Sequence, residues 1–184
     1  MSATSTANRH GFTVPGITPA DAQAVAARLQ DRLNALNDLA LTLKHVHWNV
    51  VGPNFIAIHT MIDPQVDAVR LMVDETAERI ATLGDSPVGT PGALVAARSW
   101  NDYPIGRDDA VVHLRALDEV YTGVITSHRE AIDATDSADP VTHDMLTSQT
   151  AVLEQFQWFV RAHLESASGA LPDSADSTRE ADRS

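Results

Sequence analysis

The chain has 184 residues, of which 43% are hydrophobic, a composition typical of one folded domain with a proper core and not of a disordered chain. It contains no cysteine, which excludes a disulfide framework and any thiolate metal site. Its formal net charge of −12 repels phosphate backbones and attracts cations, although solubility alone also explains an acidic surface.

The first residues lack the apolar segment of a secretory signal, and no run approaches the roughly eighteen apolar residues of a membrane span. We therefore expect a cytoplasmic protein without a membrane partner. Residues 1–17 are interpreted as an N-terminal tail, residues 18–168 as the folded domain, and residues 169–184 as a disordered acidic C-terminal tail.

The first predicted helix begins at Pro19, with Thr18 as its N-cap. Apolar residues then recur at alternating spacings of four and three, which is typical of an inward-facing helical stripe. The stripe comprises Leu29, Leu33, Leu36, Ala40, Leu43, His47 and Val50. His47 is therefore set among leucines, and the sequence Gly52-Pro53-Asn54 ends this helix.

A second long helix is predicted from about Phe55 to Leu83, ending at Gly84. Pro64 lies inside it and should bend it, because proline removes one backbone hydrogen bond. Residues 84–106 contain four glycines and three prolines, and a connection of this length normally has structure or purpose of its own. Within it, residues 91–100 are expected to form a short helix.

A third helix is predicted from about Arg107 to Ala134, and Asp139 and Pro140 begin a fourth that should end near Gly169. The third helix carries Ala110, Leu114, Leu117, Tyr121 and Val124 on one stripe, and the fourth carries Met145, Val152, Phe156, Phe159 and His163. No strand pattern or internal repeat is found. Each short link implies an antiparallel helix pair, and the long middle link permits a crossover. We predict an all-α, ferritin-like four-helix bundle with a short helix in its crossover.

The second helix carries two pairs of candidate metal ligands on one stripe. His59 and Asp63 are four residues apart, and Asp74 and Glu78 repeat that spacing. A rise of about 1.5 Å per residue nevertheless separates the ends of this stripe by roughly 28 Å. The two pairs therefore cannot form one metal site within one chain.

Two explanations remain open. The pairs could be two half-sites that are each too poor in ligands, or a two-fold axis could bring His59 and Asp63 of one chain to Asp74 and Glu78 of another. His47 can join the first pair, and such a ligand set suits iron(II), manganese or zinc. None of the seven glutamates has a histidine three residues later, so the Glu-x-x-His motif of an intrachain di-iron site is missing.

Less specific interpretations also apply. Histidines on apolar faces are usually satisfied core residues, as we expect for His113, His128 and His163. Aspartates and glutamates at helical spacing are usually solvated or paired, and Arg70 and Arg79 are near enough in sequence to pair with them. The three tryptophans, Trp48, Trp100 and Trp158, are interpreted as core residues more readily than as redox partners.

The same residues resemble a known family. Residues 47–63, HWNVVGPNFIAIHTMID, and residues 74–84, DETAERIATLG, are similar to the ferroxidase-centre signature of the Dps proteins (DNA-binding proteins from starved cells, or miniferritins). Residues 155–165, QFQWFVRAHLE, resemble the last helix of these proteins. The resemblance covers roughly residues 15–167.

The resemblance implies a hollow, homo-dodecameric shell that oxidises Fe²⁺, preferably with hydrogen peroxide rather than oxygen, and stores ferric mineral inside. It also implies a di-iron site, or a site of one iron plus water, between two-fold-related subunits. The ligands would be His47, His59 and Asp63 of one chain with Asp74 and Glu78 of its partner. Trp48 would lie next to the centre and take up stray oxidising equivalents, and the short crossover helix would lie near the dimer axis.

The alternative function that the resemblance implies is DNA compaction, with iron binding secondary and a nucleoid association. DNA-coating members usually bind through tails rich in lysine and arginine. Here residues 171–184 hold four acids against two arginines, and residues 1–17 contain only Arg9. Attraction to a phosphate backbone should therefore be weak.

An acidic segment joins the third and fourth predicted helices, with Glu130, Asp133, Asp136 and Asp139 within ten residues. Carboxylates around a symmetry axis ease the passage of a cation. In Dps proteins the matching region lies near the three-fold axis. The resemblance therefore implies an iron-uptake pore, for which Asp133 and Asp136 are favoured over Asp139, because Asp139 also serves as a helix cap.

Overall fold

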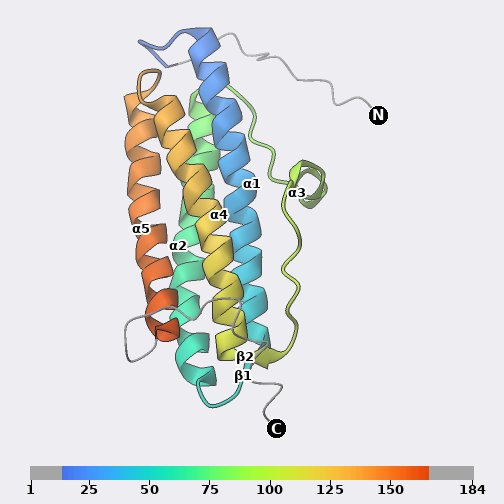
Figure 1. Cartoon of the computed structure of the whole chain (residues 1–184). Coiled ribbons are helices and arrows are strands. Elements are labelled where there is room, and N and C mark those ends of the chain that lie inside the picture. Colours follow the sequence, from blue (N-terminus) through green and yellow to red (C-terminus); the bar gives the residue numbers. More distant parts are fainter. Residues whose placement is uncertain (1–13, 166–184) are drawn as a thin grey trace.

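The computed structural model describes residues 14–165 of the chain. The predicted acidic tail over residues 169–184 and most of the predicted N-terminal tail lie outside the described residues (Figure 1). Five helices form the described part: α1 (Pro19–Asn49), α2 (Phe55–Thr82), α3 (Pro91–Ala97), α4 (Ala110–Thr135) and α5 (Pro140–Leu164). Within residues 14–165, no helix is both long and apolar enough to cross a bilayer.

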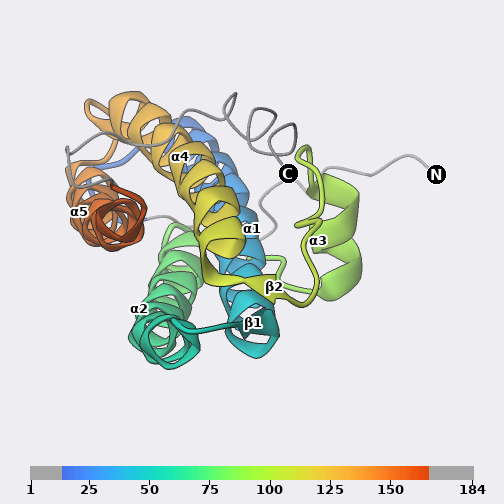
Figure 2. The ribbon, with the colours of Figure 1, turned by 60° about the horizontal axis from the view of Figure 1, so that its bottom comes forward.

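Four of the helices make a bundle of two antiparallel pairs, in which α1 packs mainly against α2 and α4 packs mainly against α5. The segment after α2 returns along the outside of the bundle, so that α2 and α4 run in the same direction (Figure 1). The short helix α3 lies outside the bundle beside α1 (Figure 2). The prediction of an all-α, ferritin-like bundle with a helix in its crossover is confirmed.

The predicted helix starts are present with their caps. The Thr18 hydroxyl accepts a hydrogen bond from the backbone N–H of Asp21 at 3.1 Å, and the Asp139 carboxylate accepts from Val141. The second helix continues through Pro64. It ends at Thr82, before Gly84, whose φ of 87° no longer fits a right-handed helix.

A two-residue parallel pairing is present although no strand was predicted. Residues Val50–Val51 (β1) pair with Asp108–Asp109 (β2) at one end of the bundle (Figure 2). Helix α4, which is the third predicted long helix, consequently begins at Ala110 and not at Arg107. Asp109 is its extended N-cap, and the Asp109 carboxylate accepts from the backbone N–H of Val111.

Two other predicted boundaries were wrong. Helix α3 ends at Ala97 rather than Trp100, with Arg98 already extended. Helix α5 ends at Leu164 rather than near Gly169, with Glu165 extended.

The predicted stripes face the core. Every residue of the first predicted stripe is buried, including His47 on α1 and Val50 on β1. His113 and His128 are fully buried as expected, but His163 is exposed and not a core residue, since it lies in the last turn of α5, facing away from the bundle. The main core cluster lies between α1, α2, α4 and α5 and reaches Val46 and Val50, directly beside the end of α1 that carries His47.

Candidate metal centre

His47 and His59 hold each other in place where α1 ends and α2 begins. Their rings stack with centroids 3.6 Å apart. His47 Nδ1 lies 3.0 Å from the His59 carbonyl oxygen, and His59 Nδ1 lies 2.9 Å from the His47 carbonyl oxygen. A carbonyl only accepts, so both Nδ1 atoms carry the proton. With Nδ1 as the donor, Nε2 is the atom of each ring that is left to bind a metal.

The Asp63 carboxylate lies next to these rings, with its Oδ1 3.3 Å from His47 Nδ1. The same oxygen accepts a hydrogen bond from Lys44 Nζ at 2.7 Å. The Lys44 ammonium is the main cause that lowers the pKa of Asp63 below 3.8, and His47 and His59 act in the same direction. The carboxylate is thus ionised at neutral pH, half-exposed, and paired with a cation.

Asp74 and Glu78 are exposed on α2, about eleven and fifteen residues along the helix from Asp63, or roughly 17 and 22 Å away. The chain accordingly brings together His47, His59 and Asp63 but not the second pair. Among residues 14–165, no three histidine, aspartate or glutamate side chains are arranged to hold a metal ion by themselves.

Large apolar side chains are exposed beside this incomplete site. Trp48 is 71% exposed, and Ile56 and Leu71, on α2, are 64% and 66% exposed. Ile56 and Leu71 lie within about 60° of Asp74 around the helix. Trp100 and Trp158 are also exposed, so the interpretation of the three tryptophans as core residues was wrong for this chain. Exposed apolar groups around polar ligands are typical of a surface that another protein chain covers.

The acidic residues proposed for a pore separate into two kinds. Asp133 and Asp136 are exposed, and Asp136 lies 3.6 Å from His143 Nδ1. Asp139 is only 1% exposed, and its Oδ2 accepts from Arg79 Nη2 at 2.6 Å. The expectation that Asp139 lines a pore is therefore corrected, because its carboxylate is enclosed and occupied by a salt bridge.

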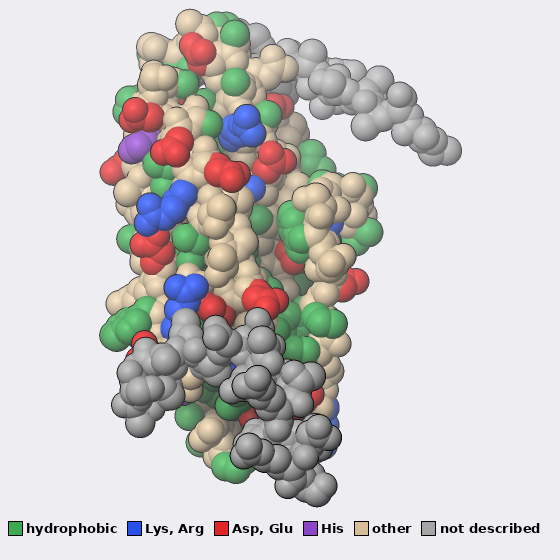
Figure 3. Space-filling model, viewed as in Figure 1, with side chains coloured by type: hydrophobic (Ala, Val, Ile, Leu, Met, Phe, Trp, Pro, Cys, Tyr) green, Lys and Arg blue, Asp and Glu red, His purple; other side chains and the backbone are tan. Residues whose placement is uncertain are grey.

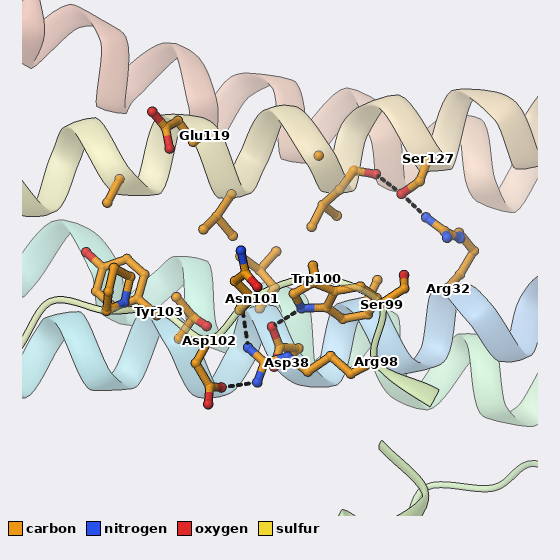
Figure 4. A pocket seen from close by; sticks show the side chains of 18 residues that line it. Arg32, Asp38, Arg98, Ser99, Trp100, Asn101, Asp102, Tyr103, Glu119 and Ser127 are labelled. Atoms are coloured by element: carbon orange, nitrogen blue, oxygen red, sulfur yellow. Dashed lines mark hydrogen bonds and ion pairs between the residues drawn. The ribbon is translucent and has the colours of Figure 1, made fainter. Parts of the chain in front are cut away.

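One cavity was not foreseen from the sequence. It encloses about 580 Å³ between α1, α4 and the crossover. Arg98 of the crossover pairs with Asp38 of α1 and with Asp102, and Trp100 Nε1 donates to Asp38 at 2.7 Å (Figure 4). These contacts fasten the crossover to α1. No sequence spacing indicates the two contacts to Asp38, since Arg98 and Trp100 are about sixty residues from it.

Charged side chains of both signs are interspersed on the face that carries α1, α4 and α5 (Figure 3). Two ion pairs join α4 and α5, Arg129 with Glu154 and Arg161 with Asp118. This face therefore offers alternating charges and not a cationic stripe.

Comparison with known proteins identifies relatives along nearly the whole length. The sequence matches the ferritin family, described as a ferritin-like domain, over residues 26–170. A DNA protection during starvation protein of Mycolicibacterium smegmatis is 57% identical over 167 residues, which is 91% of each chain. The fine tangled pili major subunit of Haemophilus ducreyi is 51% identical over 86% of this chain and 84% of its own.

Solved structures give the same picture. The structure of DpsA14 from Streptomyces coelicolor superimposes with a TM-score of 0.87 and 62% sequence identity, covering 89% of this chain and 97% of its own. The tetragonal form of Mycobacterium smegmatis Dps gives a TM-score of 0.86 with 58% identity, covering 88% of this chain and 98% of its own.

Proposed function

This chain belongs to the Dps family of ferritin-like proteins, and we propose that it is a ferroxidase that detoxifies and stores iron. It oxidises Fe²⁺, with hydrogen peroxide preferred over oxygen, at sites shared by two-fold-related subunits. The ferric product accumulates inside a hollow homo-dodecamer. The shell is cytoplasmic.

The observation that carries the proposal is the reciprocal pair of hydrogen bonds between His47 and His59. Each ring donates its Nδ1 proton to the other residue's backbone carbonyl, and both Nε2 atoms are left as ligands beside Asp63. Two imidazoles with carboxylates suit Fe²⁺. Carboxylates from a second chain would add the negative charge that favours Fe³⁺ as the product.

The spacing on α2 supports a two-fold partner as the source of the missing ligands. The midpoint between residues 59 and 78 is also the midpoint between residues 63 and 74, and it lies between Ala68 and Val69. A two-fold axis that crosses α2 there, with the partner helix antiparallel, aligns both ligand pairs at once. Asp74 and Glu78 of each chain then complete the site of the other.

Two further residues act at the proposed site. Lys44 neutralises Asp63 before the metal arrives and has to release that carboxylate to it. Trp48 follows His47 directly and exposes its indole. It can therefore give up an electron to a strong oxidant made from Fe²⁺ and peroxide.

DNA compaction is less well supported as the main function. The terminal sequences offer no cluster of lysine or arginine, and the chain carries a formal charge of −12. A phosphate backbone should gain little from such a surface at ordinary salt.

Shells of mixed composition test the shared site. Asp63→Ala and Glu78→Ala chains with different affinity tags are purified alone and after coexpression. Each variant alone should oxidise Fe²⁺ slowly. In a mixed dimer one site lacks both carboxylates and the other is intact, so random mixing should restore about a quarter of all sites.

Ferric absorbance after Fe²⁺ and peroxide addition measures the recovery, and native mass confirms that both tags share one particle. Mixed particles as inactive as the single variants would show that the ligands are not shared in this way.

A further inference from the structure

Tyr103 and His113 form a hydrogen-bonded pair where the crossover meets the start of α4. Tyr103 Oη lies 2.9 Å from His113 Nδ1, and the two rings are nearly parallel, with an interplanar angle of 6°. His113 is fully buried and Tyr103 is half-buried. The pair has no part in the proposed metal site.

The surroundings indicate which atom holds each proton. His113 Nε2 has no hydrogen-bond partner among the described residues, but the nearby backbone carbonyls of Asn49 and Gly106 act to raise the pKa of His113. A proton on Nε2 suits these carbonyls and leaves Nδ1 to accept from the Tyr103 hydroxyl. The His113 carbonyl, 3.3 Å from the hydroxyl, is a more distant alternative acceptor.

Both groups are neutral at physiological pH. Burial and the nearby Asp108 carboxylate raise the pKa of Tyr103, and burial lowers the pKa of His113 below 6.5. A neutral buried phenol loses an electron easily only when its proton can leave at the same time, because the phenol radical cation is a strong acid. A neutral imidazole in hydrogen-bond contact is the base that this step needs.

Tyr103 of this pair lies in the same groove as Trp48, the residue proposed to be oxidised. Trp48, His45 and Tyr103 line one surface groove between α1 and the crossover. His45 precedes Trp48 by one helical turn, and its ring meets that of Tyr103 edge-on at a centroid distance of 5.8 Å. Figure 4 shows the Tyr103 ring directed toward the bundle. Trp48 and the phenol therefore line the same groove, and the His45 ring in that lining contacts Tyr103.

We propose that Tyr103 and His113 are a proton-coupled redox pair that repairs oxidised Trp48. The Trp48 radical cation takes one electron from Tyr103, the Oη–H bond breaks, and the proton moves to His113 Nδ1. The products are reduced Trp48, a neutral tyrosyl radical and an imidazolium. Fe²⁺ then reduces the tyrosyl radical, and the proton returns from His113. This role rests on the proposed ferroxidase function, which supplies the one-electron oxidant and the reductant.

The chain contains its own control, since it has two tyrosines. Tyr121 is fully buried, and its hydroxyl donates to Gln65 Oε1 at 2.7 Å. An amide oxygen is too weak a base to take the phenolic proton. Tyr121 should therefore not form a radical under conditions in which Tyr103 does.

Pulse radiolysis of the iron-free shell tests the pair without any ferroxidase chemistry. Azide radicals oxidise exposed tryptophan by one electron, and the decay of the indolyl radical is followed together with the rise of the tyrosyl radical. Wild type and Tyr121→Phe should show the tyrosyl rise. Tyr103→Phe and Trp48→Phe should lose it, and His113→Gln should lose most of its yield.

A tyrosyl rise that persists in Tyr103→Phe, or that disappears in Tyr121→Phe, would overturn the proposal. So would the absence of any rise in wild type. Tyr103→Phe keeps the ring, so the test stands even if His113→Gln does not fold. Native mass confirms assembly of each variant.

Iron loading separates this inference from the proposed function. With Fe²⁺ and peroxide, Tyr103→Phe should oxidise iron like wild type but release more radicals to a spin trap. Wild type that fails to oxidise iron would refute the ferroxidase, and the radiolysis result would still decide the pair. Equal spin-trap signals in wild type and Tyr103→Phe would count against the repair role.

Discussion

Asp63 and Asp139 are both aspartates in ion pairs, but their surroundings differ. The pKa values of Asp63 and Asp139 are both lowered, and in both cases a cationic partner contributes. Asp63 is half-exposed and only paired with Lys44, so its ion pair can open to a metal. Asp139 is buried against Arg79 and caps α5, so its ion pair is structural. Burial, and not residue type, separates the proposed metal ligand Asp63 from the structural residue Asp139.

Replacement of Lys44 by methionine should tighten metal binding. Lys44 is the only lysine in the chain, and its ammonium competes with a cation for Asp63 Oδ1. Its removal should raise the affinity for Co²⁺ a few-fold, measured by calorimetric titration of the assembled protein. Lys44→Arg keeps the competing charge and serves as the control. Equal affinities in the wild type and Lys44→Met would show that the ion pair opens at no cost.

Replacement of Asp139 by alanine should destabilise the fold by about 3 kcal/mol, because it leaves the Arg79 charge unpaired and removes a helix cap. Burial raises the pKa of Asp139, but hydrogen bonds from Arg79 and Thr142 lower it by more. The folded pKa is below the unfolded one, so this stabilisation is present above about pH 4 and is lost as pH falls through the folded pKa.

Thermal midpoints at fixed protein concentration, compared at neutral and acidic pH, provide the measurement. Asp144→Ala, on the exposed face of the same helix, is the control and should change little. A gap between wild type and Asp139→Ala that stays constant as the pH falls below 4 would contradict the ionic explanation.

At the scale of elements, caps and apolar spacing predicted the helices, but they did not predict the strand pairing that joins the two halves of the bundle. Caps at Thr18 and Asp139 and the apolar stripe of α1 depend on neighbours within a turn, so the sequence contained them. The pairing of Val50–Val51 with Asp108–Asp109 joins segments almost sixty residues apart. Two residues are too few to show a strand period, so this pairing and the later start of α4 could not be predicted.

Some features of the candidate site also follow from local spacing, whereas others depend on the folded turn. Helical spacing and rise on α2 are enough to place the two ligand pairs and to exclude a site within one chain. The Nδ1-to-carbonyl bonds of His47 and His59 and the Lys44 contact to Asp63 depend on how α1 returns into α2. Such contacts follow from a particular turn geometry, which no periodicity contains.

That turn depends on Gly52, which has a φ of +94°. A Cβ at Gly52 would lie 2.8 Å from Oδ2 of Asp109, the cap of α4. Gly52→Ala should cost about 1–2 kcal/mol from the backbone alone, with a further penalty from this overlap. It should also weaken metal binding, because His47 and His59 flank the turn.

Gly123→Ala is a matched control. A Cβ at Gly123, in the middle of α4, meets no atom within 4 Å, and alanine there should stabilise the helix by about 0.5–1 kcal/mol. Denaturation midpoints of the two variants should therefore move in opposite directions. A Gly52→Ala protein as stable as wild type would show that the turn tolerates another conformation.

At the scale of the whole molecule, the chain is a unit that depends on copies of itself. The proposed metal site needs the Asp74 and Glu78 carboxylates of a second copy, and the apolar groups Ile56 and Leu71 need a cover. The proposed pore needs three chains around one axis. The proposed metal site and pore therefore depend on symmetry, which brings together side chains that are too few in a single chain.

Conversion of Asp133 and Asp136 to asparagine should slow Fe²⁺ uptake while leaving assembly and the two-fold sites intact. Both carboxylates are exposed, Asp133 in the last turn of α4 and Asp136 at its C-cap, and a ring of them would concentrate cations. The initial rate at low iron should fall by up to about tenfold at low ionic strength, and by less at high salt. The double variant Asp31→Asn, Glu119→Gln removes two other exposed charges and should keep the wild-type rate. Equal rates in both double variants would place the uptake route elsewhere.

The proposed two-fold axis also aligns two charged residues of α2. Asp67 and Arg70 are exposed on α2, and neither makes an ion pair within residues 14–165. Their midpoint is again the point between Ala68 and Val69. An axis there sets Asp67 of each chain opposite Arg70 of the other, which makes two reciprocal ion pairs beside the metal sites.

Asp67→Arg should then place like charges across the axis, and Arg70→Asp should do the same with the opposite sign. Each single variant should weaken the dimer and shift native mass toward smaller species, most strongly at low salt. The double variant exchanges the two charges and should restore both the particle and iron oxidation. This recovery depends on the axis crossing between Ala68 and Val69, because any other register pairs Asp67 and Arg70 with different residues. A double variant that assembles worse than either single one would move the axis along α2, and with it the alignment of the ligand pairs.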